Sequence, residues 1–372
     1  NCLKIILSLI KPFRGIRPEI KYAKQITSPN INYINKYNFN NKNNFLNVLN
    51  NPNISSANKM LRNLEKRKRI FQDKTENYYL YRITFNRKNM LGIVGKINLE
   101  NYDDKKILGH EETFFDRIKK RKQQLIEFNK QISPIYTTYK SNKSSLFKLK
   151  KLYKHKPNYS FISKDKCKHE LWVIDNKEYK IKVQKYLNKI KKIYICDGHH
   201  RIQAMLKSKK KISPMIVAFP DKQVNILDYN RVIKSNLDLK TIKNIILKYF
   251  FIKKRQSKTL KKNEINIYLN KSWFVIKPRK KINDLNVNIL KKLILDKILT
   301  NKNKINYISG IKGEILLEKL VKSKKFNLAF KLCPTNISQV ISYADRKRHM
   351  PQKSTWFHPK PLDGLILSEV IS

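Results

Sequence analysis

The stretch "YICDGHHRIQAML", residues 194 to 206, decides the fold, because one apolar run stops at Asp197 and another begins just after it. Gly-His-His-Arg at 198 to 201 separates the two runs. This order predicts a buried strand, a tight turn and a helix. The first turn of a helix presents free backbone N–H groups and the positive end of the helix dipole, which attract anions. The stretch therefore predicts a β-to-α turn suited to a phosphate group.

Each residue of this turn has a chemical use. Gly198 allows a close backbone approach or a positive φ, and Arg201 can bind phosphate through two parallel hydrogen bonds. His199 and His200 can donate hydrogen bonds, transfer a proton or bind metal. Asp197 can hold a divalent cation or orient a histidine. The simpler interpretation is a polar turn with Asp197 as the helix N-cap, but five such residues in a row favour a functional site.

His110 and Glu111 stand in "GHEETFF", residues 109 to 115, just before a basic helix-like stretch. The spacing differs from HExxH, which excludes that metalloprotease motif at this position. An acidic residue at a helix start is favoured by the helix dipole alone. The pair is therefore a weak signal by itself.

The segment "HMPQKSTWFHPKPLDGL", residues 349 to 365, contains three prolines, which fix an extended backbone path. Lys353, Ser354 and Lys360 lie along it. Two interpretations stay open: an arm packed by its own aromatic residues, or a lid that clamps phosphate. The sequence contains no GxxxxGK[ST], GxGxxG or GxSxG pattern.

The chain carries a formal net charge of +55 over 372 residues, a value that often indicates nucleic-acid binding. Only 15 of its 82 basic residues are arginine, and the lysines are spread along the whole chain. Abundant Asn and Ile and only 8 glycines fit the codon usage of an A+T-rich genome. We therefore expect no specific nucleic-acid partner, only non-specific attraction to polyanions.

Cysteine spacing and hydropathy indicate a cytoplasmic protein without a membrane span. The cysteines, at positions 2, 167, 196 and 333, include no CxxC pair, so neither a disulfide framework nor a zinc knuckle is indicated. "LKIILSLI", residues 3 to 10, is too short to cross a bilayer and lacks a cleavage site, and we expect a strand there. The sequence does not indicate an oligomeric state.

The hydrophobic pattern alternates between strand and helix periods, which predicts an α+β fold of mixed sheets with flanking helices. The pattern restarts near residue 235, which predicts two α+β domains, 1–235 and 236–372. Residues 140 to 170 are rich in Lys and Ser, and we expect a surface excursion there. The main expected elements are a hairpin at 78–85 and 90–99, helices at 114–128, 179–190, 201–211, 239–250 and 287–299, and strands at 133–139, 169–175, 192–196, 214–221, 265–269 and 273–278.

Ordered motifs along the chain resemble a bacterial and archaeal family known as domain of unknown function 1015. The resemblance covers nearly the whole sequence. It rests on "PFRGIRP" (12–18), "LGIVGKINLENY" (91–102), "HEET" (110–113), "YICDGHHR" (194–201), "AFPDKQVNILDYNRVIK" (218–234) and "MPQKSTWFHPKPLDGLIL" (350–367).

The DGHHR segment is similar to the phosphate loop of ParB-like folds, which include free-serine kinases that use a nucleotide as phosphate donor. The resemblance implies a ParB-like phosphate loop at residues 197 to 201. It also implies that the other family motifs contribute, namely His110, Glu111 and Thr113, then Arg121, and in the C-terminal arm Lys353, Ser354 and Lys360.

The implied function is a nucleotide-dependent phosphotransferase that acts on a small, serine-like hydroxyl substrate and uses ATP or ADP with Mg²⁺. In this hypothesis His200 or Glu111 is the base, His110 and Asp197 are also catalytic, and Asp197 binds the metal. The groups implied to bind the nucleotide are Gly198, His199, Arg201, Arg121, Lys353, Ser354 and Lys360.

Two alternatives stay open. One is a nucleotide-binding regulatory module without catalysis, although the strands expected at 214–233 argue against a helix-turn-helix after the loop. The other is a metal-dependent hydrolase. The hydrolase would use His110, His199, His200 and Asp197.

Two acids of the family pattern are replaced in this chain, by Asn32 and Lys120. These replacements weaken the expectation of an intact base or metal site.

Overall fold

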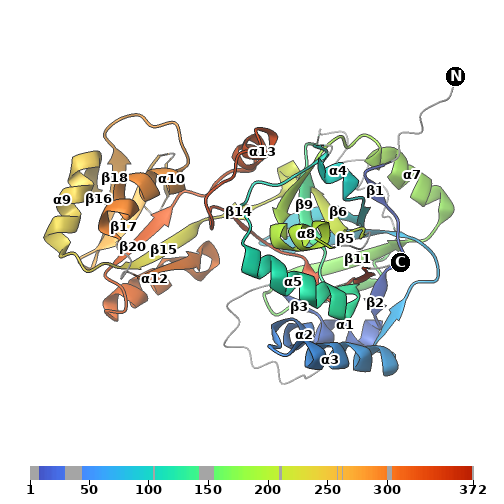
Figure 1. Ribbon diagram of the computed structural model, residues 1–372. Coiled ribbons are helices and arrows are strands. Elements are labelled where there is room, and N and C mark those ends of the chain that lie inside the picture. The colour runs from blue at the N-terminus through green and yellow to red at the C-terminus, as the bar shows by residue number, and fades with distance from the viewer. Residues whose placement is uncertain are drawn as a thin grey trace. The chain divides into compact units, whose positions relative to one another are not determined.

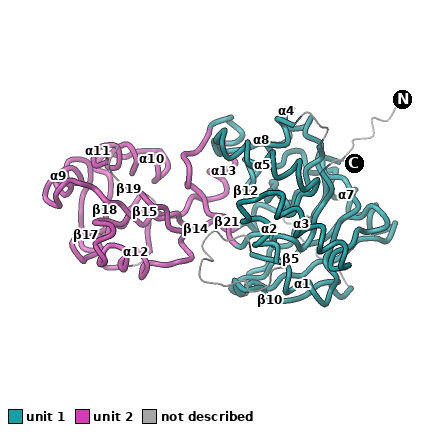
Figure 2. The backbone as a smooth tube through the Cα atoms, turned by 60° about the horizontal axis from the view of Figure 1, so that its bottom comes forward, with its two compact units in different colours: residues 1–224, 344–348, 359–372 teal, residues 225–343, 349–358 magenta. Residues whose placement is uncertain are grey.

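The computed structural model describes residues 8–29, 44–103, 105–141, 155–208, 212–257, 259–261, 263–299 and 304–370. The chain forms two compact units (Figure 2). Unit 1 comprises residues 1–224, 344–348 and 359–372, and unit 2 comprises residues 225–343 and 349–358. A division at residue 235 differs from these units because the C-terminal segment returns to unit 1.

Unit 1 is built around a mixed sheet with flanking helices, which confirms the predicted α+β class (Figure 1). Its strands are β1 (Ile10–Lys11), β5 (Tyr78–Phe85), β6 (Lys88–Ile97), β7 (Ile107–Leu108), β9 (Ile135–Tyr139), β10 (Tyr159–Ile162), β11 (Lys168–Ile174), β12 (Ile193–Asp197) and β13 (Met215–Pro220). The order is β10-β11-β5-β6-β13-β9-β12-β7, and β1 also pairs with β6. β13 is parallel to β9 and β7 is parallel to β12, whereas the other neighbours are antiparallel.

The β5–β6 hairpin confirms the one predicted from sequence. Its turn residues, Asn86 and Arg87, both have positive φ, at 47° and 62°. This is the conformation of a tight type I′ turn, whose twist matches that of the two strands. Most residues of both strands are buried, so the hairpin lies in the core of unit 1.

Two helices cover one face of this sheet. Val183 and Leu187 of α7 (Lys177–Leu187) and Ile202 of α8 (His199–Leu206) share one buried cluster with sheet residues such as Ile193 and Ile216. α5 (Phe115–Phe128) packs against α8, where its apolar face meets the buried residues Ala204 and Met205 (Figure 1). The first turn of α8 is thereby fixed between the sheet and α5.

Short two-stranded ladders hold the N- and C-terminal segments on unit 1. β2 (Ile16–Pro18) pairs with β4 (Ile70–Gln72), β3 (Ser28–Pro29) with β22 (Leu362–Asp363), and β8 (Lys130–Gln131) with β23 (Ser368–Glu369). The remaining helices of this unit are α1 (Ile20–Ile26), α2 (Phe45–Asn50), α3 (Ile54–Lys66), α4 (Glu100–Asp103) and the 3₁₀ turn η1 (Asp221–Gln223).

Unit 2 contains a six-stranded antiparallel sheet in the order β16-β18-β17-β20-β15-β19. A second buried cluster joins this sheet to its helices through residues such as Val232, Leu317 and Ala329. The elements are β14 (Ile226–Leu227), β15 (Tyr229–Lys234), α9 (Leu239–Tyr249), β16 (Phe250–Lys254), β17 (Ile265–Leu269), β18 (Ser272–Pro278), α10 (Asn286–Leu290), the π turn η2 (Lys291–Leu295), α11 (Asp296–Ile298), β19 (Lys304–Ser309), η3 (Gly310–Lys312), α12 (Gly313–Lys322), β20 (Leu328–Leu332) and β21 (Trp356–Phe357); α13 (Ile337–Asp345) ends in unit 1.

Three expectations need correction, and a fourth, the strand at 3–10, falls mostly outside the described residues. The surface excursion at 140–170 contains strand β10 and the start of β11, and residues 142–154 lie outside the described part. The helix expected at 287–299 is interrupted by the π turn η2, and the helix expected from 201 begins at His199. Of the strand expected at 3–10, only Ile10 lies in a described strand, because residues 3–7 are outside the described ranges. Within those ranges no helix combines the length and apolarity needed to cross a bilayer.

Candidate functional site

The turn between β12 and α8 is built as the sequence predicts. β12 ends at Asp197, Gly198 has φ 109° and ψ 17°, and α8 begins at His199. Gly198 is the N-cap of the helix, so the simpler interpretation, with Asp197 as the cap, is wrong. The Asp197 carboxylate is therefore available to side chains outside the helix.

Asp197 forms ion pairs with two basic side chains. Lys360 Nζ lies 2.6 Å from its Oδ1, and Arg201 Nη2 lies 3.5 Å from its Oδ2. Burial alone would raise the pKa of Asp197, but the positive charges of Lys360 and Arg201 hold it well below its ordinary value. The carboxylate is thus ionised at neutral pH. Both oxygens already face a positive group, which does not fit a Mg²⁺ ion bound at this carboxylate.

Arg201 connects the turn to the start of β9. Its Nη1 donates to the carbonyl oxygens of Ser133 at 2.8 Å and Pro134 at 3.2 Å. A β-carbon on Gly198 would lie only 2.9 Å from Arg201 Nη2 and would displace that side chain, and the φ of 109° also favours glycine. Arg201 therefore has a structural role in addition to any role toward phosphate.

Arg121 of α5 is the most accessible cation of this group. Its side chain is exposed, yet burial among protein atoms lowers its pKa, and the positive charge of Arg201 lowers it further. Its Nη1 donates to Gln124 Oε1 at 2.8 Å, and no carboxylate of the described residues forms an ion pair with it. Solvent thus reaches a cation whose charge the protein does not neutralise directly.

Asp363 is a second acid in this group. It is 3% exposed and accepts a hydrogen bond from Ser133 Oγ. Burial raises its pKa, against the opposing influence of the Ser133 hydrogen bond and of Arg201, Arg121 and Lys360. Asp197 and Asp363 therefore lie in one charged cluster with their pKa values shifted in opposite directions.

The two histidine-containing motifs meet at one edge of the sheet. β7 and β12 are parallel neighbours, so their carboxyl ends lie side by side, followed by His110 and by His199. The backbone N–H of His110 donates to His199 Nε2 at 3.3 Å, and His110 Nδ1 donates to the carbonyl oxygen of Ile195 at 3.0 Å. The two rings are edge to face, with centroids 4.7 Å apart.

These contacts fix the position of the proton on His199. Because its Nε2 accepts a hydrogen bond, a neutral His199 carries its proton on Nδ1. That atom lies 3.5 Å from Glu111 Oε2, and the Glu111 side chain is 30% exposed. Glu111 thus lies beside a buried histidine nitrogen while solvent still reaches its carboxylate.

His200 is used differently from its neighbour. Its Nε2 accepts the backbone N–H of Phe114 at 3.2 Å, and the two rings stack at 5.9 Å. This contact joins the start of α8 to the start of α5. A lone pair already bound by a backbone N–H is a poor proton acceptor, so the geometry disfavours His200 Nε2 as the base.

The structure thus brings together most of the residues singled out from the sequence, in unit 1. Lys353 and Ser354 belong to unit 2, where Lys353 Nζ lies over the Tyr229 ring and Ser354 Oγ donates to the Pro351 carbonyl. Asn32 lies outside the described residues. The unit 1 group comprises Asp197, Gly198, His199, His200, Arg201, His110, Glu111, Arg121 and Lys360.

Sequence reasoning missed Ser133 and Asp363. Asp363 stands in the "PLDG" part of the C-terminal motif, three residues after Lys360, and Ser133 opens "SPIYTTY". The available signals were that Ser133 directly precedes a buried strand and that Asp363 is an acid inside a motif. Neither signal predicts which segment the residue contacts.

The chain combines an α+β fold with a glycine turn that faces basic side chains. It belongs to a protein family of unknown function. The chain is a member of the protein family of unknown function DUF1015, whose model matches residues 10–298. This confirms the family predicted from the motifs. No curated protein matches the chain.

Several solved structures are similar to this chain at low sequence identity. C-terminally truncated SbnI from Staphylococcus aureus has a TM-score of 0.45 at 12% identity, covering 73% of this chain and 85% of that one. A free serine kinase variant in complex with ADP has a TM-score of 0.42 at 13% identity, covering 73% and 92%. A conserved hypothetical protein from Pyrococcus furiosus has a TM-score of 0.39 at 13% identity, covering 73% and 94%.

Proposed function

We propose that this protein is a nucleotide-dependent phosphotransferase that phosphorylates a small hydroxyl compound. The observation that carries the proposal is the group of three cations around the start of α8, namely Arg121, Arg201 and Lys360. Of the two acids in their midst, burial raises the pKa of Asp363 and the cations keep Asp197 ionised. Positive charge in excess at a helix N-terminus attracts phosphate.

The phosphates of ATP or ADP would bind at this helix start. Arg121 is accessible and can approach an anion without breaking an ion pair. Lys360 can exchange its contact with Asp197 for a phosphate oxygen, because both are charge-assisted hydrogen bonds. Arg201 keeps its backbone contacts and adds positive charge at short range.

Transfer would follow from positioning and charge neutralisation. The acceptor hydroxyl oxygen attacks the terminal phosphorus, and the bond from that phosphorus to the bridging oxygen breaks. The shortened nucleotide leaves with the electron pair, and Glu111 takes the hydroxyl proton. Glu111 suits this role because it is partly exposed and its Oε2 lies 3.5 Å from His199 Nδ1. Asp197 is a weaker base because its pKa is held low.

The binding test compares two adjacent cations on α5. We expect Arg121→Ala to weaken ADP and ATP binding at least tenfold in titration calorimetry at high salt, with little change in stability. Lys120→Ala, which removes an exposed charge one residue away, is the matched control and should bind as the wild type does. Equal affinities for all three proteins would contradict the assignment of the phosphate site.

Catalysis is tested separately with Glu111→Gln. This variant should bind nucleotide normally and fail to transfer phosphate to serine or other small alcohols. Binding by the wild type without transfer to any alcohol would instead favour the regulatory module. The hydrolase alternative finds no support at Asp197, because Lys360 and Arg201 already contact both of its oxygens.

A further inference from the structure

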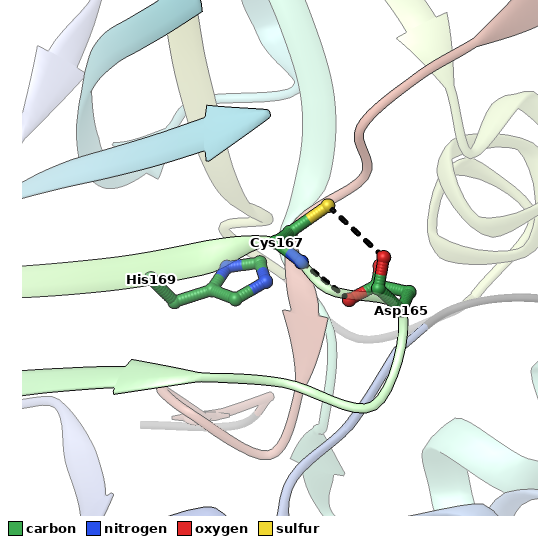
Figure 3. Close-up of side chains that lie close together, drawn as sticks. All are labelled: Asp165, Cys167 and His169. Atoms are coloured by element: carbon green, nitrogen blue, oxygen red, sulfur yellow. Dashed lines mark hydrogen bonds between the residues drawn. The ribbon is translucent and has the colours of Figure 1, made fainter. Parts of the chain in front are cut away.

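The turn between β10 and β11 gathers three metal-ligating side chains that play no part in the site described above. Asp165 lies in the turn, Cys167 directly precedes β11, and His169 is the second residue of that strand. One potential ligand atom from each lies within 4.8 Å of the others, and Figure 3 shows the three side chains together. The motif is Asp-x-Cys-x-His.

His169 leaves one ring nitrogen without a partner in a fully buried position. The residue is 0% exposed, its Nδ1 is 2.7 Å from Tyr81 Oη, and its Nε2 has no hydrogen-bond partner among the described residues. Whichever nitrogen carries the proton, Nε2 is then an unmet donor or an unmet lone pair.

A metal ion would pair the unpartnered Nε2 of His169 in one of its two tautomers. With the proton on Nδ1, the ring donates to Tyr81 Oη and presents the Nε2 lone pair to the metal. Ligating histidines usually donate their other N–H in this way, which fixes the ring. In Figure 3 the ring lies beside Cys167, with the edge that bears Nε2 turned toward Asp165.

Cys167 and Asp165 complete the set from the same hairpin. Cys167 is 0% exposed, and its position two residues before His169 places both on one face of the extended chain. Asp165 Oδ1 accepts from Cys167 N at 3.3 Å and from Ser163 Oγ, which holds the carboxylate in the turn. The Cys167 thiol in turn donates to the backbone carbonyl of Asp165, with Sγ and O 3.9 Å apart.

We propose that Asp165, Cys167 and His169 bind a zinc-like divalent cation with one position left for water. Sulfur, nitrogen and oxygen together are the ligand set of zinc sites. Ligand atoms of a tetrahedral site lie about 3.5 Å apart, and the three candidate atoms lie within 4.8 Å of one another. Tyr81 Oη, which contacts His169 Nδ1, also accepts the backbone N–H of Leu362, two residues after Lys360. The cluster therefore adjoins the arm that carries Lys360, but the two proposals use different residues and are tested separately.

Cobalt is the probe, because it reports directly on its ligands. The chelator-treated full chain is titrated anaerobically with Co²⁺. We expect one ion per chain, a thiolate-to-cobalt charge-transfer band in the near ultraviolet, and loss of the band when Zn²⁺ is added. Cys167→Ser should abolish the band. Cys333→Ser, which alters a partly buried thiol in unit 2, should leave it unchanged.

Asp165→Asn keeps the proposal falsifiable if Cys167→Ser fails to fold. Its amide oxygen can still accept the two turn hydrogen bonds, so the hairpin is preserved, but the anionic ligand is lost. We expect at least tenfold weaker Co²⁺ binding for this variant. Absence of a charge-transfer band in the wild type, or an unchanged affinity in Asp165→Asn, would overturn the proposal.

Discussion

Two aspartates only a few side chains apart experience opposite environments. Asp197 contacts Lys360 and Arg201 directly, and their positive charges lower its pKa, whereas Asp363 is almost fully buried and burial raises its pKa. Pairs of titratable groups with pKa values shifted apart are typical of catalytic sites. At the residue scale, the opposite pKa shifts of the two aspartates distinguish this cluster from an ordinary polar turn better than the sequence motif does.

The low pKa of Asp197 makes a pH-dependent contribution to stability. A carboxyl group with a depressed folded pKa stabilises the fold above its unfolded pKa, about 3.9. That contribution is lost as the pH falls toward the folded value. We therefore expect Asp197→Asn to lower the free energy of unfolding by about 1–2 kcal/mol at pH 7. The difference from wild type should shrink below about pH 4.

Urea denaturation at pH 7, 5 and 3.5 measures this difference. Asp175→Asn, an exposed acid without an ion pair among the described residues, is the control and should change stability little at any of the three values. If the free energy of unfolding of Asp197→Asn stays below that of the wild type by the same amount down to pH 3.5, the loss of stability is not electrostatic.

At the element scale, the β12–α8 turn depends on Gly198. A side chain there meets an unfavourable φ of 109° and would also press on Arg201, 2.9 Å away. We expect Gly198→Ala to cost about 2 kcal/mol of stability and to weaken nucleotide binding by displacing Arg201. Thermal unfolding and calorimetry measure the two effects.

Gly313 provides the matched control for this substitution. It also has a positive φ, 67°, but an added β-carbon there would meet nothing within 4 Å. Gly313→Ala should therefore lose stability through backbone strain alone and keep full nucleotide affinity. Equal nucleotide affinity in Gly198→Ala and Gly313→Ala would show that the β12–α8 turn is not part of the nucleotide site.

The elements themselves were largely predictable because their signals are local. The β5–β6 hairpin, β12 and α5 follow from apolar runs and periodicity. β10 was missed because its four residues, "YSFI", sit in a Lys-rich stretch. The π turn in "KKLIL" was missed because a strongly apolar run reads as continuous helix.

The site was predictable only in part, for a different physical reason. Residues 197 to 201 are adjacent in sequence, so their convergence follows from one turn. Contacts of Asp197 with Lys360 and of Ser133 with Asp363 join segments more than 150 residues apart. No local pattern encodes such pairs, and the family motif supplied Lys360 but not Asp363. The Asp-x-Cys-x-His cluster was also missed, since cysteine spacing alone gives no metal signal there.

At the scale of the whole molecule, a net charge of +55 must attract polyanions regardless of any specific site. If the charge reflects composition, binding to duplex DNA should be independent of sequence and steeply dependent on salt, because each phosphate contact releases counterions. We expect equal affinities for two unrelated duplexes of the same length, and a strong loss of affinity between 50 and 200 mM KCl, about a thousandfold or more.

Arg121→Ala should not alter this DNA binding, because one charge in so many contributes little. Fluorescence anisotropy at several salt concentrations measures all three quantities. A tenfold preference for one duplex would instead indicate a specific nucleic-acid surface, and loss of DNA binding in Arg121→Ala would place that surface at the start of α8.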